Sequence, residues 1–408
     1  MWFTIKLAWR NLFRNKRRTF IAGTAIALGL ASMMFIDALM IGMKEVMIRS
    51  ATGSFLGDAQ IHRNGFRVTQ EVEKTINNPE KIIANLEKEE AVDQFTPRTL
   101  SFGMITSPAN VSSVLLVGIN PETEKHLSQI DDVIRDGNYF EDDNERDIII
   151  GSKLAEILEV DLGDRVVITV SQAKSGDLSQ EMFRISGIYH FNIDEMDSGF
   201  ALVKLSKAQE MLAIGSNIHE IAIKFKDMRV SLQEDHPIWQ KYSVDDNEAV
   251  SWLAILPQMG AILGMFWISL LFMAVILFGI VAFGIINTLF MSLYERLFEF
   301  GVLRAVGTRS SGVRRLIVFE AGALAVISCI MGIILGFILI FIVTKTGIDY
   351  RGIEFSGTTL REIMYPVFHI QQFIIYPLAV FVFTILIGHY PAVVAGKMSI
   401  SNALRKSL

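Results

Sequence analysis

The chain of 408 residues lacks the motifs on which several kinds of chemistry depend. Its one cysteine, Cys329, excludes an intramolecular disulfide and a cysteine-based metal site. No G-x-x-x-x-G-K-[ST] stretch is present, so the usual loop that holds a nucleoside triphosphate is missing. No G-x-S-x-G occurs, and His219-Glu220 is not followed by the second histidine of a zinc-binding helix. We therefore expect this chain to hold no catalytic residue, metal or cofactor; if ATP and Mg²⁺ are used, a separate subunit binds them.

Apolar residues are abundant instead. They make up 51% of the chain, with 28 Phe and 18 Met, and the mean hydropathy is +0.39. Such values exceed those of soluble domains and predict a membrane protein. Long apolar runs predict four membrane-spanning helices, at 20–43, 261–291, 316–344 and 370–390. The second would be about 46 Å long as a helix, which exceeds the hydrocarbon core of a bilayer.

Glycines recur in these runs at the spacing that lets membrane helices pack closely. Gly332 and Gly336 form a G-x-x-x-G pair in the third run, and we expect them to face another helix. We expect the same of Gly260, just before the second run, and of three glycines within it: Gly264, Gly279 and Gly284.

Charge is divided unequally along the chain. Residues 44–260 carry 21 Lys and Arg against 36 Asp and Glu, a balance of −15, whereas the rest carries 17 against 7, a balance of +10. The basic part is expected on the cytoplasmic side of a membrane. With four spans, both termini then lie inside, as do the basic segments 1–19, 292–315 and 391–408, and the loop 345–369 lies outside.

The amino-terminal segment 1–19 holds six basic residues and no acidic one. Trp2, Ile5 and Trp9 share one helical face, which predicts an amphipathic helix in the headgroup region with its basic side toward anionic lipids. A cleaved signal peptide is the alternative. We favour a retained helix because the following run of 20–43 is long enough to span the bilayer.

The polar stretch 44–260 predicts a large outer domain of one or two folded parts. Expected strands cover Asp147–Ile150, Arg165–Val170, Met182–Ile188, Phe200–Leu205 and Glu220–Phe225. Expected helices cover Pro79–Glu90, Ser152–Leu158, Ser206–Leu212 and Asn247–Met259. This mixture predicts an α+β domain. Because the stretch carries no catalytic or metal-binding motif, we expect it to bind a partner or transmit force.

The outer end of the first run carries candidate substrate-lining residues: Met33, Met34, Asp37, Met40 and Met43. An acid inside a span commonly lines a polar cavity, and flexible thioethers suit a surface that adapts to varied apolar shapes. Ordinary packing of the methionines is the alternative, as is an Asp37 carboxylate that reaches the outer headgroups.

A charged stretch, 292–320, lies between the second and third runs. Each charge would cost about 2.5–3.5 kcal/mol at the centre of a spanning helix, so the stretch must lie beside the bilayer. Its apolar residues recur at spacings of three and four, which predicts a helix with one apolar face. We expect Tyr294–Arg304 to contact a separate ATPase; membrane-surface anchoring is the alternative. The other charged residues are Arg309, Arg314 and Arg315, expected at headgroups, and Glu320, expected just inside the third span.

Four motifs carry a family resemblance. The runs GIINTLFMSLYER and EFGVLRAVG, which begin at Gly284 and Glu299, resemble the coupling segment of the ABC permeases that include lipoprotein-releasing permeases, macrolide and peptide exporters, and the cell-division permease. The basic cluster after Leu12 resembles the entry helix of that family. Leu162-Gly-Asp-Arg-Val is similar to a motif of its outer domain, and Tyr390-Pro-Ala with Asn402-Ala-Leu-Arg to its carboxyl-terminal signature.

The resemblance implies a complex of two permease copies, identical or not, with two cytoplasmic ATPases in a bacterial inner membrane. Nucleotide-driven closure of the ATPases would move the outer domains. By the same carry-over, four residues of the helix would lie in or near the groove of the ATPase: Glu295, Arg296, Glu299 and Arg304. Tyr294 is grouped with them as a coupling residue.

Lipoprotein release toward a periplasmic acceptor is the favoured function, with a lateral apolar entry between the first two spans. Export of another amphipathic substrate, such as a peptide or drug, or signalling to a periplasmic partner without cargo, is the alternative. Membrane lipids are expected partners and nucleic acids are not.

Overall fold

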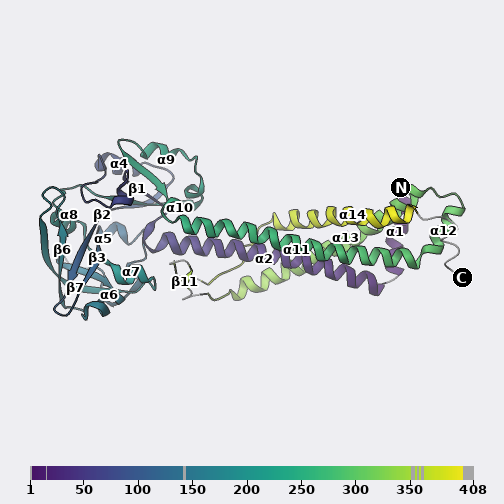
Figure 1. The fold of residues 1–408 in the computed structure, drawn as a ribbon, viewed down its shortest axis with the longest axis horizontal. Coiled ribbons are helices and arrows are strands. Elements are labelled where there is room, and N and C mark those ends of the chain that lie inside the picture. Colours follow the sequence, from purple (N-terminus) through teal and green to yellow (C-terminus); the bar gives the residue numbers. More distant parts are fainter. Residues whose placement is uncertain are drawn as a thin grey trace. The chain divides into compact units, whose positions relative to one another are not determined.

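The computed structural model describes residues 2–14, 16–140, 144–350, 354–355, 358–359 and 363–397. The chain divides into two compact units. We call one the helical unit, made of Met1–Glu45, Leu263–Asp349 and Ile363–Leu408, and the other the sheet unit, made of Val46–Ile262 and Tyr350–Glu362. Figure 1 labels many of their helices and strands.

Long helices account for most of the helical unit. Their bounds are α1 (Trp2–Arg14), α2 (Lys16–Ala51), α11 (Pro257–Glu295), α12 (Leu297–Ala305), α13 (Ser310–Thr346) and α14 (Gln372–Lys397). Four of them, α2, α11, α13 and α14, are long and apolar enough to cross a membrane. The first three extend past the predicted apolar runs at both ends, because helical hydrogen bonding continues where the side chains become polar.

Glycines on α13 and α14 set the close approach of the helices, as predicted for Gly332 and Gly336. A Cβ added at Gly332 would lie 2.8 Å from Leu30 Cδ2 and 3.0 Å from the Ala27 carbonyl oxygen, and one at Gly336 would lie 3.3 Å from Met34 Sδ. The G-x-x-x-G pair of α13 therefore faces α2. Gly388 of α14 makes a similar approach to α13.

The corresponding prediction for α11 is wrong within this chain. A Cβ added at Gly264, Gly279 or Gly284 would meet no described atom within 4 Å. A Cβ added at Gly260 would lie 3.2 Å from Leu253 Cδ2 and would meet no other long helix within 4 Å. These glycines lie on an open face of α11, whose large apolar side chains, such as Trp267 and Phe283, are also exposed.

One mixed sheet organises the sheet unit. Its ten strands are β1 (Ala59–Arg63), β2 (Val92–Thr106), β3 (Val111–Ile119), β4 (Ile134–Gly137), β5 (Asp147–Gly151), β6 (Arg165–Ser171), β7 (Leu178–Tyr189), β8 (Phe200–Lys204), β9 (Glu220–Phe225) and β10 (Asn247–Ser251). The strand order is β10-β1-β9-β2-β3-β8-β5-β7-β4, and β6 pairs with both β2 and β7. The pairs β3–β8 and β5–β7 are parallel. A further two-stranded sheet joins β11 (Glu354–Phe355) and β12 (Thr358–Thr359).

Short helices flank the sheet (Figure 1). They are the π-helix η1 (Thr52–Leu56), α3 (Phe66–Thr69), α4 (Pro79–Leu86), α5 (Pro121–Glu124), η2 (Asp131–Val133), α6 (Ser152–Leu158), α7 (Asp194–Gly199), α8 (Leu205–Leu212), η3 (Met228–Leu232), α9 (Pro237–Tyr242) and α10 (Trp252–Ile255). Strand β5 is buried along its whole length, with Ile148 and Ile150 in one core cluster and Ile149 in another. The α+β class predicted for this part of the chain is confirmed.

The expected elements of the sheet unit are mostly present. All five predicted strands appear, as β5 to β9, and three predicted helices appear as α4, α6 and α8. The helix predicted for Asn247–Met259 is wrong in its first part, because Asn247–Ser251 forms β10 and pairs antiparallel with β1. Its later part is helical, as α10 and the start of α11. The long hairpin of β2 and β3 was missed. Buried polar residues on β2, among them Thr96, Arg98 and Ser101, remove the apolar alternation that marks a strand.

Replacing Gly332 by Leu should destabilise the helical unit, by about 1–3 kcal/mol, because the new side chain has no room beside α2. Replacing Gly279 by Leu is the matched control, since the same side chain there meets open space within the chain. Thermal unfolding of the two variants in detergent measures the difference. Equal losses of stability would contradict the packing of α13 on α2.

Candidate functional site

The candidate coupling site begins at a bend between α11 and α12. Arg296 is the one residue between these helices, with φ −110° and ψ 17°. Its side chain is buried, and its Nη1 donates a hydrogen bond of 2.6 Å to Glu320 Oε1 of α13. Its Nε donates to Glu299 Oε2 of α12 at 3.0 Å, and the guanidinium lies over the Phe300 ring. The bend is thus bonded to α12 and to α13.

Helix α1 joins the same group of side chains. Asn11 Nδ2 donates to Glu320 Oε1 at 2.7 Å, and Arg14 Nη1 pairs with Glu299 Oε1 at 2.8 Å. We call Asn11, Arg14, Arg296, Glu299 and Glu320 the polar network. It connects α1, the bend, α12 and α13, and it lies beside an apolar cluster that includes Ala8, Leu293 and Phe300.

Electrostatics favours the ionised forms of Arg296 and Glu299. Burial by itself lowers the pKa of Arg296, but Glu320 and Glu299 outweigh it and hold the pKa above its usual value. Burial likewise raises the pKa of Glu299, whereas Arg296 and Arg14 lower it, and the net pKa is below the usual value. Two cations therefore face two carboxylates inside one network.

The predicted coupling residues separate into two groups. Arg296 is 7% exposed and Glu299 is partly exposed, and both are engaged in the polar network. Tyr294 is 57% exposed; Glu295 is exposed and Arg304 partly so, and both of these also interact within the chain. The charged residues of the helix thus do not share one outward face.

Sequence reasoning named Tyr294 as a coupling residue but did not recognise Phe298, Val302 and Val306 as exposed apolar residues that continue its spacing. Tyr294, Phe298, Val302 and Val306 recur every fourth residue and are all exposed, Val306 by 83%. We call these four residues the apolar stripe. Their spacing was visible in the sequence, but it did not show which side of α12 packs on the other helices.

The candidate substrate-lining residues also separate. Met33 and Met34 are buried, and Met34 packs against Gly336. Asp37 and Met40 instead line a groove of about 160 Å³ between α2 and α11. The other residues that line it are Ile41, Lys44, Leu263, Phe266, Trp267 and Leu270. Met43 is half-buried, and Tyr376 of α14 hydrogen-bonds to Asp37.

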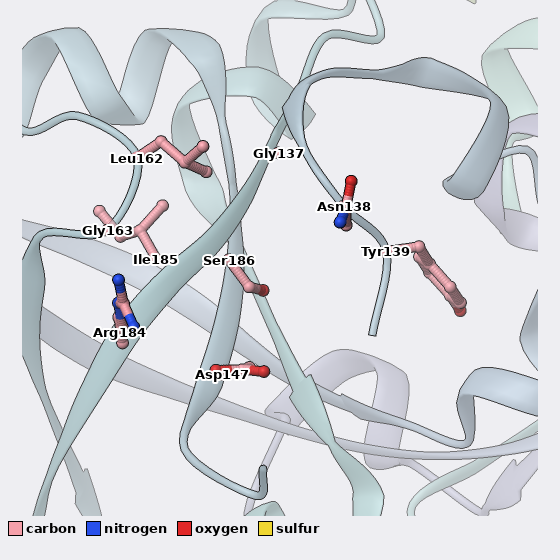
Figure 2. A pocket seen from close by; sticks show the side chains of 9 residues that line it. All are labelled: Gly137, Asn138, Tyr139, Asp147, Leu162, Gly163, Arg184, Ile185 and Ser186. Atoms are coloured by element: carbon pink, nitrogen blue, oxygen red, sulfur yellow. The ribbon is translucent and has the colours of Figure 1, made fainter. Parts of the chain in front are cut away.

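A second cavity, of about 310 Å³, lies in the sheet unit, where no site was predicted. Figure 2 shows Arg184, Ile185 and Ser186 along β7, with Asp147 at the start of β5. Asn144 donates to the buried Asp147 carboxylate at 2.6 Å. Tyr139, also in the lining, donates its hydroxyl to the Pro121 carbonyl oxygen, and burial raises its pKa. Among the described residues, no cluster of His, Cys, Asp and Glu could hold a metal ion.

A buried arginine crosses the middle of the sheet unit. Arg98 of β2 is 0% exposed and makes two hydrogen bonds to Glu124, of 2.9 and 2.6 Å, and one of 2.7 Å to Glu220. Its guanidinium lies 3.7 Å from the ring centre of Phe55 in η1. This cluster ties the π-helix to β2, α5 and β9 and was not predicted.

His219 lies close to that cluster and is held in its neutral form. Its Nδ1 accepts a hydrogen bond from the Leu100 backbone N–H at 3.2 Å, so the proton is on Nε2, which donates to the Val72 carbonyl oxygen at 2.8 Å. The ring is fully buried and stacks on Phe66. Burial lowers the pKa of His219 below its ordinary value of 6.5.

Two protein families match this chain in adjoining parts. Residues 19–233 match the MacB-like periplasmic core domain, and residues 258–400 match the FtsX-like permease C-terminal region. This chain belongs to the FtsX/MacB-like family of ABC permeases. The permease is therefore a multi-pass membrane protein, with a MacB-like α+β periplasmic domain between its first two long helices. Permease subunits of ABC transporters as a class lack ATPase activity and work with a separate ATPase subunit.

Curated relatives of the permease are distant. Lipoprotein-releasing system transmembrane protein LolE of Haemophilus influenzae is 20% identical over 278 residues, which cover 65% of this chain and 65% of that protein, just under two thirds. LolC of Neisseria meningitidis is 20% identical over 356 residues, or 81% of each chain. An uncharacterized ABC transporter permease of Methanocaldococcus jannaschii is 24% identical over 213 residues, 50% of this chain and 51% of that protein.

Solved structures are also similar to part of the permease. The periplasmic region of MacB from Actinobacillus actinomycetemcomitans matches 52% of this chain and 95% of that one, at 16% identity and a TM-score of 0.35. The extracellular domain of the ABC-type transporter YknZ from Gram-positive bacteria matches 47% of this chain and 98% of that one, at 13% identity and a TM-score of 0.32.

The stability of the sheet unit should fall as the pH drops below about 6.5. The pKa of His219 is lower in the folded state than its ordinary value of 6.5, so the unfolded chain takes up the proton first and is favoured as the pH falls toward the folded pKa. Replacing His219 by Gln should reduce the loss of stability between pH 7.5 and 5.0, measured by thermal unfolding of the purified permease. His126 is exposed, and its replacement by Gln is the control. An unchanged pH dependence in the His219 variant would contradict the assignment.

Proposed function

We propose that this permease passes ATPase-driven motion to its periplasmic domain and thereby releases lipoproteins from the inner membrane toward a periplasmic acceptor. The groove between α2 and α11 is the observation that carries this proposal. Its walls are largely apolar, from Met40, Ile41, Phe266 and others, while Asp37 and Lys44 supply a carboxylate and an ammonium group. An amphipathic cargo needs both, because its acyl chain requires an apolar surface and its protein part remains polar.

The size of the groove fits part of a cargo. A volume of about 160 Å³ is below that of a pocket for a drug-sized ligand, so it would hold one section of an acyl chain. The flexible Met40 side chain suits chains of varied shape. The LolC and LolE relatives, at 20–23% identity, carry lipoprotein release in their names and support the same cargo class.

The apolar stripe is the surface proposed for the ATPase. Tyr294, Phe298, Val302 and Val306 are exposed in a segment that must lie beside the bilayer, so a soluble protein that covers them would remove apolar surface from water. The positive-inside rule supports a cytoplasmic position for this segment and for both termini. Two such ATPases and a second permease copy would complete the complex.

A photocrosslinking residue at Met40 should capture acylated protein in native membranes, because Met40 lines the groove. The control is the same residue at Leu28 of α2, which is 57% exposed but does not line the groove. Mass spectrometry of the adducts identifies the cargo. Equal capture at the two positions, or capture of lipid alone at Met40, would contradict a cargo groove, and an amphipathic peptide or drug there would favour export.

Depletion of the permease should leave mature lipoproteins in the inner membrane, because their release would have stopped. Membrane fractionation followed by quantitative mass spectrometry measures their distribution. Normal sorting after depletion would contradict lipoprotein release and favour signalling or another cargo.

Replacing Val306 by Glu should reduce the ATPase that co-purifies with the permease at least tenfold, because a charge would enter the apolar contact. Replacing Thr308 by Glu is the control, since Thr308 is exposed and lies outside the apolar stripe. Quantitative immunoblotting after purification in mild detergent gives the ratio of the two subunits. The docking assignment fails when both variants retain the ATPase equally.

A further inference from the structure

The bend between α11 and α12 is mechanically critical if a partner moves α12. Only Arg296 separates the two helices, and its side chain does not cap α12. A bend of one residue can change its angle at little cost unless other contacts hold it. A loose bend would absorb the displacement of α12 and leave the long helices where they are.

Glu320 is the residue on which the bend is held. Its Oε1 accepts from Arg296 at 2.6 Å and from Asn11 at 2.7 Å, so one oxygen atom joins the bend to both α1 and α13. Glu320 is 6% exposed and Arg296 is 7% exposed. Removing one partner of a buried ion pair leaves the other charge uncompensated, so the two side chains strongly favour staying together.

Glu299 provides a second attachment on the far side of Arg296. Its two carboxylate oxygens bind different segments: Oε2 accepts from Arg296 Nε of the bend at 3.0 Å, and Oε1 pairs with Arg14 Nη1 of α1 at 2.8 Å. Because Glu299 lies in α12 itself, any rotation of α12 about the bend must stretch these bonds or carry α1 along.

A small cavity beside Glu320 gives the network room for a water molecule. Its volume is about 20 Å³, which is enough for one water. Hydroxyl and amide groups surround it, from Asn11, Thr19, Thr288 and Ser292. These residues come from α1, α2 and α11, so three helices besides α13 surround Glu320 at this cavity.

We propose that Arg296 and Glu320 are positioning residues of the coupling mechanism: they hold the α11–α12 bend against α1 and α13, so that a displacement of α12 moves these helices together. The proposal rests on the proposed function, in which an ATPase docks on the apolar stripe. It assigns to Arg296 a role inside the permease, whereas the family resemblance had placed this residue in or near the ATPase groove.

Two conservative variants test the proposal. Glu320→Gln keeps an oxygen that can accept from Asn11 and removes the charge that holds Arg296. Arg296→Gln removes the cation and leaves Glu320 bonded to Asn11. Arg309→Gln is the matched control, because Arg309 is exposed and lies outside the polar network. The reversed pair, Arg296→Glu with Glu320→Arg, tests whether the pairing itself is what matters.

The experiment uses the permease with its co-purified ATPase in lipid nanodiscs, in a Cys329→Ser background. Spin labels at Met265 of α11 and Ile342 of α13, both exposed, report the distance between these helices by pulsed electron paramagnetic resonance, with and without ATP and vanadate. The amount of bound ATPase is measured on the same samples. We expect both single variants to retain the ATPase within twofold of the parent, to lose at least half of the nucleotide-dependent distance change, and to regain it in the reversed pair.

Two outcomes would overturn the proposal. One is an unchanged distance shift in Glu320→Gln and Arg296→Gln. The other is loss of the ATPase to the extent seen for Val306→Glu, which would make the network part of the docking surface. A parent complex that shows no shift with nucleotide would instead overturn the proposed mechanical function, a result that the parent sample alone reveals.

Discussion

An ionised carboxylate on an apolar, membrane-spanning helix requires a partner, and in this permease that requirement falls on Glu320. Its side chain is almost fully buried near the start of α13, and Arg296 and Asn11 satisfy it. Because those partners come from the α11–α12 bend and from α1, the amphipathic helix and the bend are bound to α13. The arrangement of one end of the helical unit follows from the cost of leaving that charge without its partners.

The long helices differ in how closely they pack against one another. The glycines of α13 bring it into contact with α2, whereas those of α11 face open space. Of the four candidate spans, α11 is also the least buried: 17% of its most apolar 18-residue stretch is buried inside the protein. Within the helical unit, α11 is therefore the helix with the most surface available to lipid or to another chain, and one side of the groove at Met40 and Trp267 belongs to it.

How far the sequence could predict the fold depended on how local the determining interactions were. Strands β5 to β9 were found because their apolar runs are bounded by turn residues, and α6 and α8 because their periodicity is helical. Strand β2 was missed because its buried residues include Arg98, whose partners Glu124 and Glu220 lie 26 and 122 residues away. The bond from Asn11 to Glu320 spans 309 residues, and no local pattern encodes such a contact.

At the candidate sites, too, local patterns predicted the elements but not which residues meet. Helical periodicity identified α12 as a helix with an apolar side, but not which side packs on its neighbours. Arg296, which the family resemblance had placed in or near the ATPase groove, is buried at the bend. The methionines of α2 formed one group in the sequence, yet Met34 packs on Gly336 and Met40 lines the groove, because each position faces a different neighbour.

By itself, the sequence determined the membrane class, the four apolar helices, the α+β domain between the first two, the family, and the absence of a nucleotide-binding loop. These properties depend on composition, run length and local spacing, which the chain carries without being folded. The tertiary structure decided which charges meet, which glycines face another helix, and which methionine is accessible. Those outcomes depend on how helices and strands distant in sequence align, because an ion pair or a close contact exists only when both of its partners are in place.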